Sequence, residues 1–296
     1  MRRGSGSRRI IKMAKRIDGK AISAQIRAEI KEKTADFYQQ NGFLPGLAVI
    51  IVGENPASQV YVRNKKKACE EVGFHSEVYE LPEATEQAEL NALVDRLNAD
   101  STIHGILVQL PLPKHLDENE VLLRINPAKD VDAFHPYNVG KIMIGDYDFL
   151  PCTPAGVMAL LERTGIDPAG KKCVVIGRSN IVGKPMAMLL LHANGTVTVC
   201  HSRTKDLAAV AREADILVVA IGRADFVGAD MVKPGAVVID VGMNRRADGK
   251  LTGDVDFDAV EPIASYITPV PGGVGPMTIT MLLQNTLTAA SKKAAQ

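Results

Sequence analysis

The chain has 296 residues, 46% of them hydrophobic, which is enough for two domains with substantial cores and argues against a disordered protein. Its formal net charge is +1, but residues 1–16 carry seven basic side chains and no acidic one, so the remainder holds 28 basic against 34 acidic residues, or −6. A body of that sign is not expected to bind nucleic acid, and no apolar run reaches the roughly 18 residues that a membrane-spanning helix requires.

Residues 1–16 form a basic leader with a Gly-Ser-Gly-Ser run, and a more ordinary sequence begins at Met13. The leader lacks the apolar core of a secretory signal. We therefore expect it to be disordered, expect the protein to be cytoplasmic, and leave the leader out of the fold prediction.

The cysteines and histidines predict neither a disulfide framework nor a metal site. The four cysteines are scattered and contain no C-x-x-C pair, so they are expected to be small buried residues in a reducing compartment. The six histidines form no spaced cluster that could ligate a metal.

In the first half, strand-like and helix-like segments alternate, which predicts a parallel sheet covered by helices. Strands are expected at residues 47–52, 76–81 and 103–110, and helices at residues 58–72 and 86–99. Thr85 is the expected N-cap of the second helix. Pro111 and Pro113 end the third strand and leave Gln109 near its carboxyl end, where open α/β sheets bind ligands.

Within the first expected helix, Tyr61 and Lys65 are four residues apart and therefore lie on one face. Such a pair would present a flat stacking surface and a proton-carrying group to the same space, which suits chemistry on a flat heteroaromatic substrate. Taken alone, Lys65, Lys66 and Lys67 read more simply as a solvated basic run on a surface helix.

The second half begins near residue 151 and repeats the alternation. Strands are expected at residues 172–176, 196–200, 216–221 and 237–241, and a helix at residues 184–193. This order predicts a dinucleotide-binding fold of the Rossmann type. Residues 278–290 read as an amphipathic helix that would pack back on the first domain.

The loop from Gly177 to Gly183 lies between an expected strand and helix, where a pyrophosphate would meet the helix N-terminus. Its glycines are six residues apart, so it does not match G-x-G-x-x-G, and an ordinary strand-to-helix turn is the competing interpretation. After the next strand, Ser202 and Arg203 stand where a site for NAD usually carries an acid. With Arg178 adding positive charge, this pattern favours NADP over NAD.

Four segments, taken together and in order, resemble one family. They are Tyr61-x-x-x-Lys65, residues 109–113 (QLPLP), residues 129–132 (KDVD) and residues 271–278 (PGGVGPMT). The chain resembles the bifunctional methylenetetrahydrofolate dehydrogenase/methenyltetrahydrofolate cyclohydrolase family (the FolD family). The second half agrees at residues 177–185, 199–202 and 240–244, and the likeness runs from about Ile17 to Ala289.

The resemblance implies NADP-dependent oxidation of 5,10-methylenetetrahydrofolate to 5,10-methenyltetrahydrofolate, followed by hydrolysis to 10-formyltetrahydrofolate. It implies that Tyr61 stacks on the folate, that Lys65 is the central catalytic group and that Gln109 orients this lysine. Asp132 would hold the pterin through two parallel hydrogen bonds. No synthetase activity is expected.

The resemblance also implies the remaining site residues and the organisation of the chain. The folate site would further include Val108, Leu110, Pro271, Gly272 and Gly273. The NADP site would include Gly177, Arg178, Ser179, Val182, Gly183, His201, Ser202, Arg203 and Gly242, with His201 lining the site. Residues 17–150 with 279–296 would form the α/β folate-binding catalytic domain, residues 151–278 the Rossmann-like NADP-binding domain, with a cleft between them and a homodimer through the nucleotide domain.

Simpler interpretations exist for each residue. Asp132 could cap a local segment, Gln109 could be a solvent-facing strand end, and Thr278 could cap the last helix while the glycine loop before it is a linker. Two other protein classes share parts of the pattern: an NADP-dependent dehydrogenase of the amino-acid or shikimate type, and a non-catalytic NADP-binding protein. Lys65 and Gln109 together argue against the second, and the first has no evident use for Asp132 with the glycine loop.

Overall fold

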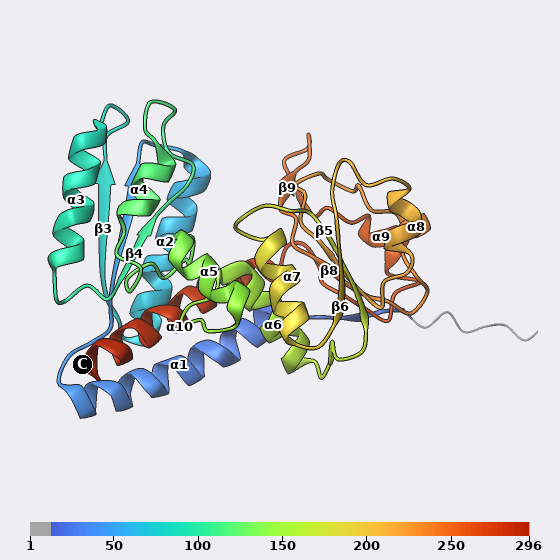
Figure 1. The fold of residues 1–296 in the computed structure, drawn as a ribbon, viewed down its shortest axis with the longest axis horizontal. Helices are drawn as coiled ribbons and strands as arrows, with labels where there is room; N and C mark the ends of the chain where they lie inside the picture. Colours follow the sequence, from blue (N-terminus) through green and yellow to red (C-terminus); the bar gives the residue numbers. More distant parts are fainter. Residues whose placement is uncertain (1–12, 296) are drawn as a thin grey trace, which may run out of the picture.

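The computed structural model describes residues 13–295, which form two α/β lobes connected by long helices (Figure 1). The first lobe is built on a three-stranded sheet and the second on a six-stranded sheet. All the strand pairs within these two sheets are parallel. The predicted fold class, α/β with a Rossmann-like second half, is confirmed.

The sheet of the first lobe has the order β3-β2-β4, and its middle strand is buried on both faces. The strands are β2 (Gly46–Val52), β3 (His75–Leu81) and β4 (Gly105–Val108). Alternate residues of β2 belong to different cores: Val49 packs with residues of α2 (Pro56–Val72) and α10 (Val274–Ala294), and Ile50 packs with residues of α3 (Gln87–Ala99) and α4 (Glu118–Arg124). Burial on both faces explains the continuous apolar sequence of this strand.

The second sheet has the order β1-β11-β8-β7-β5-β6 and holds the nucleotide-type half. Its central strands are β5 (Lys172–Ile176), β7 (Ile216–Val219) and β8 (Val237–Asp240), with β6 (Thr196–Cys200) at one edge. One face is covered by α6 (Cys152–Arg163) and α7 (Gly183–His192), and the other by α8 (Leu207–Ala211) and α9 (Phe257–Val260). Because the strands are parallel, the loops after β5, β7 and β8 emerge at one edge.

The expected strands at residues 172–176 and 196–200 match the structure, and the others differ only at their ends. Two helix starts were predicted wrongly. The helix α3 begins at Gln87 with Glu86 at its N-cap, and the buried Thr85 hydroxyl has no hydrogen-bond partner among the described residues. The last helix begins at Val274 with Gly273 at its N-cap, so Thr278 lies inside it.

The expectation of disorder for residues 1–16 is wrong at the end of the leader. Lys15–Arg16 forms β1, which pairs in parallel with β11 (Tyr266–Ile267) at the edge of the second sheet, and Ala14 is buried. Arg16 also makes an ion pair with Glu261 at 2.6 Å. The first twelve residues lie outside the described part of the chain.

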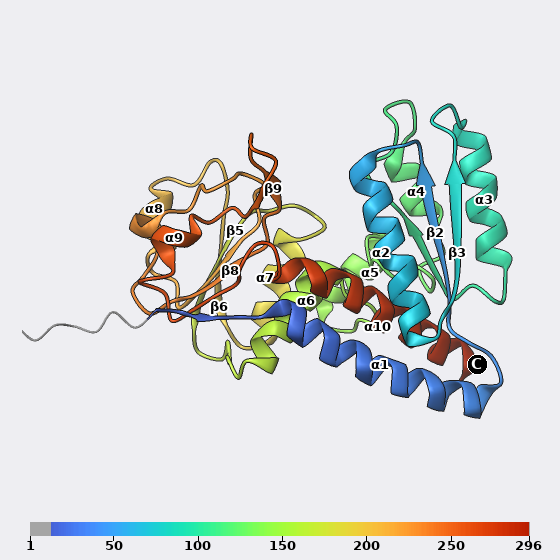
Figure 2. The ribbon, with the colours of Figure 1, turned by 180° about the vertical axis from the view of Figure 1, so that it is seen from behind.

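The long helices α1 (Gly19–Asn41) and α10 run from the second lobe beneath the first, where they pack on each other (Figure 2). The helix α10 also packs on α6, and Ser23 and Thr280 share a buried hydrogen bond between α1 and α10. The two lobes are therefore held at one side by shared helices.

The remaining elements are short. They are α5 (Pro136–Ile144), η1 (Ala229–Met231) and the two-stranded ribbon of β9 (Asn244–Arg245) and β10 (Leu251–Thr252). None of the described helices is both long enough and apolar enough to span a membrane. All four cysteines are buried and free, as the sequence predicted.

Candidate functional site

The pair that stood out in the sequence lies on α2, and the structure buries its lysine. Lys65 is only 7% exposed, and its Nζ donates to Gln109 Oε1 at 2.9 Å. The amide of Gln109 is itself held, because its Nε2 donates to the Leu110 carbonyl at 2.8 Å. Gln109 thus turns its oxygen toward the lysine and is not a solvent-facing strand end.

Burial lowers the pKa of Lys65 below its usual range, because the protonated amine loses its hydration. The carboxyl group of Asp132 opposes this shift, and its own pKa is raised by burial and pulled back by Lys65. Lys66 and Lys67 are exposed, as their interpretation as surface charge predicted. The basic run therefore contains one buried amine with different electrostatics from its two neighbours.

Asp132 is held next to Cys152, a residue that the sequence marked only as a small buried thiol. The Cys152 Sγ, at the start of α6, donates to Asp132 Oδ1 at 3.4 Å. The amide of Asn285 on α10 donates to the carbonyls of Val131 and Leu150 at 2.8 Å each. Asn285 was not identified from the sequence, because its role depends on contacts with residues 135 and 154 positions away in the chain.

A cavity of about 960 Å³ lies between the lobes, and its lining includes Tyr61 and Asn64 of α2 but not Lys65, Gln109 or Asp132. Tyr61 lines it from the first lobe, and the segments 240–245 and 269–276 line it from the second. Four of the predicted site residues therefore meet Tyr61 at one space: Gly242, Pro271, Gly272 and Gly273. The Tyr61 hydroxyl crosses the cavity to donate to Met243 Sδ at 2.9 Å.

Val108 and Leu110, two of the predicted substrate-binding residues, do not line the cavity. Val108 is buried in the core on the α3 side of the first sheet, so its side chain faces away from α2. Leu110 is partly buried and acts in the site through its carbonyl, which accepts from Gln109. Neither side chain is among those that line the cavity between the lobes.

The loop after β5 has a conformation that requires both of its glycines. Gly177 has φ of 128°, and a Cβ there would lie 2.3 Å from the Ala220 carbonyl oxygen. A Cβ at Gly183 would lie 2.3 Å from the carbonyl oxygen of Gly177. The Ser179 hydroxyl accepts from the backbone N–H groups of Val182 and Gly183, which shapes the start of α7. This close approach of backbone at a helix N-terminus fits a pyrophosphate.

The turn after β6 carries the second part of the predicted nucleotide site. Ser202 and Arg203 are exposed, and the backbone N–H of Arg203 donates to His201 Nδ1 at 3.1 Å. Arg178 is exposed on the neighbouring loop. Since no carboxylate precedes Asp206 in this turn, the group of side chains fits a phosphate on the ribose better than a free hydroxyl.

Two buried aspartates at the same edge of the second sheet were not among the predicted site residues. Asp240 ends β8, and burial raises its pKa to about 7. Asp254 follows β10, is fully buried, and accepts hydrogen bonds from the loop after β7. In the sequence, only the flanking Gly253 and Val255, in an otherwise polar stretch, indicated that Asp254 could be buried. Within residues 13–295, no group of three or more His, Cys, Asp or Glu side chains could hold a metal ion.

Comparison with known proteins places both halves of the chain in one family. The tetrahydrofolate dehydrogenase/cyclohydrolase catalytic domain matches residues 17–132, and the NAD(P)-binding domain of the same family matches residues 151–294. The bifunctional protein FolD of Moorella thermoacetica is 62% identical over 276 residues, which cover 93% of this chain and 98% of that protein.

Solved structures agree over nearly the same span. The bifunctional FolD methylenetetrahydrofolate dehydrogenase/cyclohydrolase of Campylobacter jejuni is 55% identical, with a TM-score of 0.90, over 93% of this chain and 98% of that one. The FolD enzyme of Trypanosoma brucei, solved in complex with NADP cofactor and inhibitor, is 43% identical, with a TM-score of 0.91, over 95% of this chain and 98% of that one.

Proposed function

The chain belongs to the tetrahydrofolate dehydrogenase/cyclohydrolase family, and we propose which of its residues perform the two reactions. It is a bifunctional enzyme that oxidises 5,10-methylenetetrahydrofolate to 5,10-methenyltetrahydrofolate with NADP and then hydrolyses the product to 10-formyltetrahydrofolate. This places the protein in one-carbon metabolism. The two alternative classes considered from the sequence are not needed to explain any residue.

The observation that carries the assignment of residues is the contact between Lys65 Nζ and Gln109 Oε1 in a buried environment. Burial favours the neutral amine, and one N–H of that amine is already committed to Gln109. In the neutral form of the amine, the nitrogen lone pair can accept a proton. Lys65 is therefore the group that takes a proton from the water that attacks the methenyl carbon.

Asp132 and Tyr61 position the substrate. The carboxyl of Asp132, steadied by Cys152, faces the amino-pyrimidine edge of the pterin, where a carboxylate accepts two parallel hydrogen bonds. Tyr61 provides the flat ring on which the folate stacks at the wall of the cavity. Pro271, Gly272 and Gly273 close the opposite wall, which brings the reacting carbon between the lobes.

When bound, NADP supplies the acceptor for the hydride that leaves the one-carbon bridge. The loop from Gly177 to Gly183 would hold its pyrophosphate, and Ser202 and Arg203 would hold the phosphate on its ribose. The role of the chain in the oxidation is to align the two carbons between which the hydride moves.

We propose three further properties that follow from the family and the sequence. Residues 17–150 and 279–296 act as the catalytic domain and residues 151–278 as the NADP-binding domain. Two copies associate through the nucleotide half, where β6 is an open sheet edge. The protein works in the cytoplasm, an assignment supported by four free thiols and by bacterial relatives.

The test supplies methylenetetrahydrofolate with NADP, and separately with NAD, and follows the appearance and decay of the methenyl compound by absorbance. We expect NADP reduction, transient methenyl accumulation and its hydrolysis, with a clear preference for NADP. No reduction of either cofactor would refute the dehydrogenase activity. Equal use of NAD would refute the roles of Ser202 and Arg203.

A further inference from the structure

Asp254 is fully buried, at 0% exposure, and gathers hydrogen bonds from two loops. Its Oδ2 accepts from the backbone N–H groups of Ile221 and Gly222, at 2.7 and 3.0 Å. Its Oδ1 accepts from the N–H of Arg223 at 2.8 Å and from Asn244 Nδ2 at 2.8 Å. One carboxylate thus fixes the loop after β7 and a side chain of the loop after β8.

Asp240 fixes Asp254 in turn. The Oδ1 of Asp240 accepts from the backbone N–H groups of Gly242 and Asp254, each at 2.9 Å, and its Oδ2 accepts from that of Val255 at 3.0 Å. The packing leaves no room for side chains between them. A Cβ at Gly253 would lie 1.7 Å from Asp240 Oδ2, and one at Gly242 would lie 2.3 Å from the Asp254 carboxyl.

The position of these loops relates them to the path of a bound dinucleotide. The predicted pyrophosphate loop follows β5, and the predicted ribose-phosphate site follows β6, on one side of β5. An extended dinucleotide must then continue across the other side, over the ends of β7 and β8. The loop after β8 lines the cavity between the lobes, where Tyr61 and the 269–276 segment meet. The loops that Asp254 ties together therefore lie along the path to the nicotinamide end.

We propose that Asp254 is a positioning residue for the dehydrogenase reaction, which fixes the loops at residues 220–223 and 241–245 so that they hold the cofactor's nicotinamide end at the cavity. This rests on the function proposed above. The carboxylate acts through the loops and makes no contact with substrate. Residues 220–223 and Asn244 consequently form a surface that contacts the cofactor. The buried carboxylate of Asp254 holds this surface in place.

The experiment uses the full-length chain and the variant Asp254→Asn, which keeps the size of the side chain. An amide turns an NH2 group toward backbone N–H donors, so part of the acceptor set is lost. We expect the KM for NADP to rise about tenfold or more, while hydrolysis of added methenyltetrahydrofolate, measured without NADP, stays within about twofold of wild type. Retained hydrolysis shows that the fold is intact.

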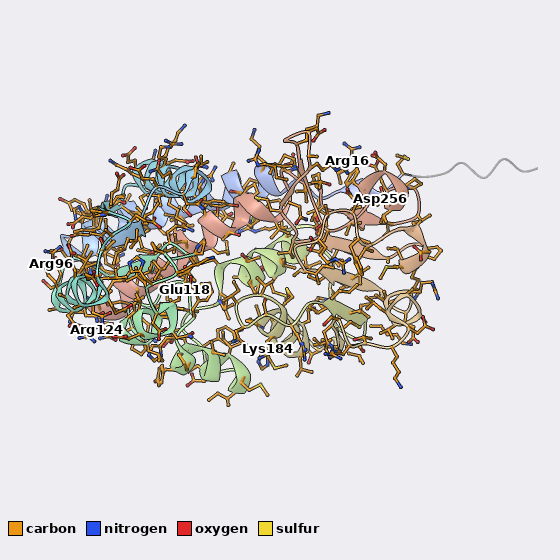
Figure 3. The ribbon with its side chains drawn as sticks, turned by 90° about the horizontal axis from the view of Figure 1, so that it is seen from above. Arg16, Arg96, Glu118, Arg124, Lys184 and Asp256 are labelled. Carbon is orange, nitrogen blue, oxygen red and sulfur yellow. The ribbon has the colours of Figure 1, made fainter. Side chains whose placement is uncertain are left out.

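The matched control is Asp256→Asn. Asp256 lies two residues away on the second lobe, where Figure 3 labels it, and its side chain accepts from the backbone N–H of Ala259 at the start of α9. Both activities are expected to equal wild type in this variant. A KM for NADP within about twofold of wild type in Asp254→Asn would overturn the proposal, and so would an equal loss of both activities.

A second variant guards against a folding failure of the first. Asn244→Ala removes one side-chain donor from Asp254 at a partly exposed position, and a rise of about threefold in the KM for NADP is expected. An unchanged KM for NADP in Asn244→Ala would contradict the proposal. Failure of the wild-type enzyme to reduce NADP would instead refute the proposed function and is seen before any variant is made.

Discussion

The carboxyl edges of the two sheets are organised by different means. At the first sheet, Lys65, Gln109 and Asp132 form a cluster in which side chains contact side chains and burial shifts the pKa values of the ionisable groups. At the second sheet, the buried carboxyl groups of Asp240 and Asp254 bind backbone N–H groups of the surrounding loops. One edge presents reactive groups, and the other presents shaped backbone.

This difference indicates that the two edges have different roles in the reaction. A desolvated amine changes the rate of a proton transfer, because its protonation state enters the reaction directly. A loop held by a buried carboxylate changes how well a cofactor is bound and aligned. Substitutions at the first edge should therefore lower rates, and substitutions at the second should weaken the binding of NADP.

The largest effect is expected for Lys65→Met, which keeps an unbranched side chain of similar size and removes its amine. Hydrolysis of methenyltetrahydrofolate should fall by about a thousandfold, because the proton acceptor is lost, while the Kd for NADP stays within about twofold. Lys66→Met, at the exposed neighbour, should leave both unchanged. Stopped-flow absorbance and fluorescence titration give the two numbers, and rapid hydrolysis by Lys65→Met would remove this lysine from the mechanism.

A smaller but still large effect is expected for Gly242→Ala. The new Cβ would lie 2.3 Å from the Asp254 carboxyl, so the loop after β8 must shift. We expect the KM for NADP to rise about tenfold with hydrolysis nearly intact. Gly140→Ala on α5, where a Cβ meets nothing within 4 Å, is the control and should equal wild type in steady-state kinetics. Equal behaviour of the two variants would contradict the role of the second edge.

Arg203→Ala should act only on the choice of cofactor. Removing the guanidinium should lower the ratio of kcat/KM for NADP to that for NAD by about tenfold, because the phosphate on the ribose loses a charged partner. Lys205→Ala, two residues further along the same exposed turn, should change the ratio much less. If both variants change the ratio equally, the preference reflects general positive charge and not a site.

His104 tests the first lobe away from catalysis, and the expected effect is on stability alone. Burial lowers the pKa of His104 to about 4, while its Nδ1 accepts from the Gly46 N–H. Between about pH 6.5 and pH 4 the unfolded chain binds the extra proton, so stability falls as the pH falls through that window.

Protonation of His104 therefore lowers the free energy of unfolding by about 2 kcal/mol between pH 7 and pH 5. His104→Asn should lose that part of the pH dependence in urea unfolding, with both activities at pH 7 retained. An identical pH slope in wild type and variant would show that another group titrates.

The sequence was sufficient where the structure depends on local pattern. The strands β5 and β6 could be placed correctly because apolar and β-branched residues run continuously there. The start of α10 could not, because its N-cap is Gly273 in a loop shaped by Pro269 and Thr268. Nor could β1, since Lys15–Arg16 pairs with a strand 251 residues away in the chain.

Part of the candidate site could likewise be predicted from local sequence pattern, and part could not. The spacing of Tyr61 and Lys65 was visible in the sequence, but the burial of Lys65 required segments that are distant in the chain, at Gln109 and Cys152. Asp254 follows a glycine between two short polar stretches and resembles a surface turn. Its role follows only from the fold, which brings two loops onto one carboxylate.

The central claim is that the two edges do separable work, and a crossed measurement on Lys65→Met and Asp254→Asn tests it most directly. Hydrolysis of methenyltetrahydrofolate and binding of NADP are measured for both variants beside wild type. The account predicts opposite patterns: Lys65→Met loses hydrolysis and binds NADP normally, and Asp254→Asn hydrolyses normally and binds NADP weakly. Loss of both properties in both variants would contradict the account.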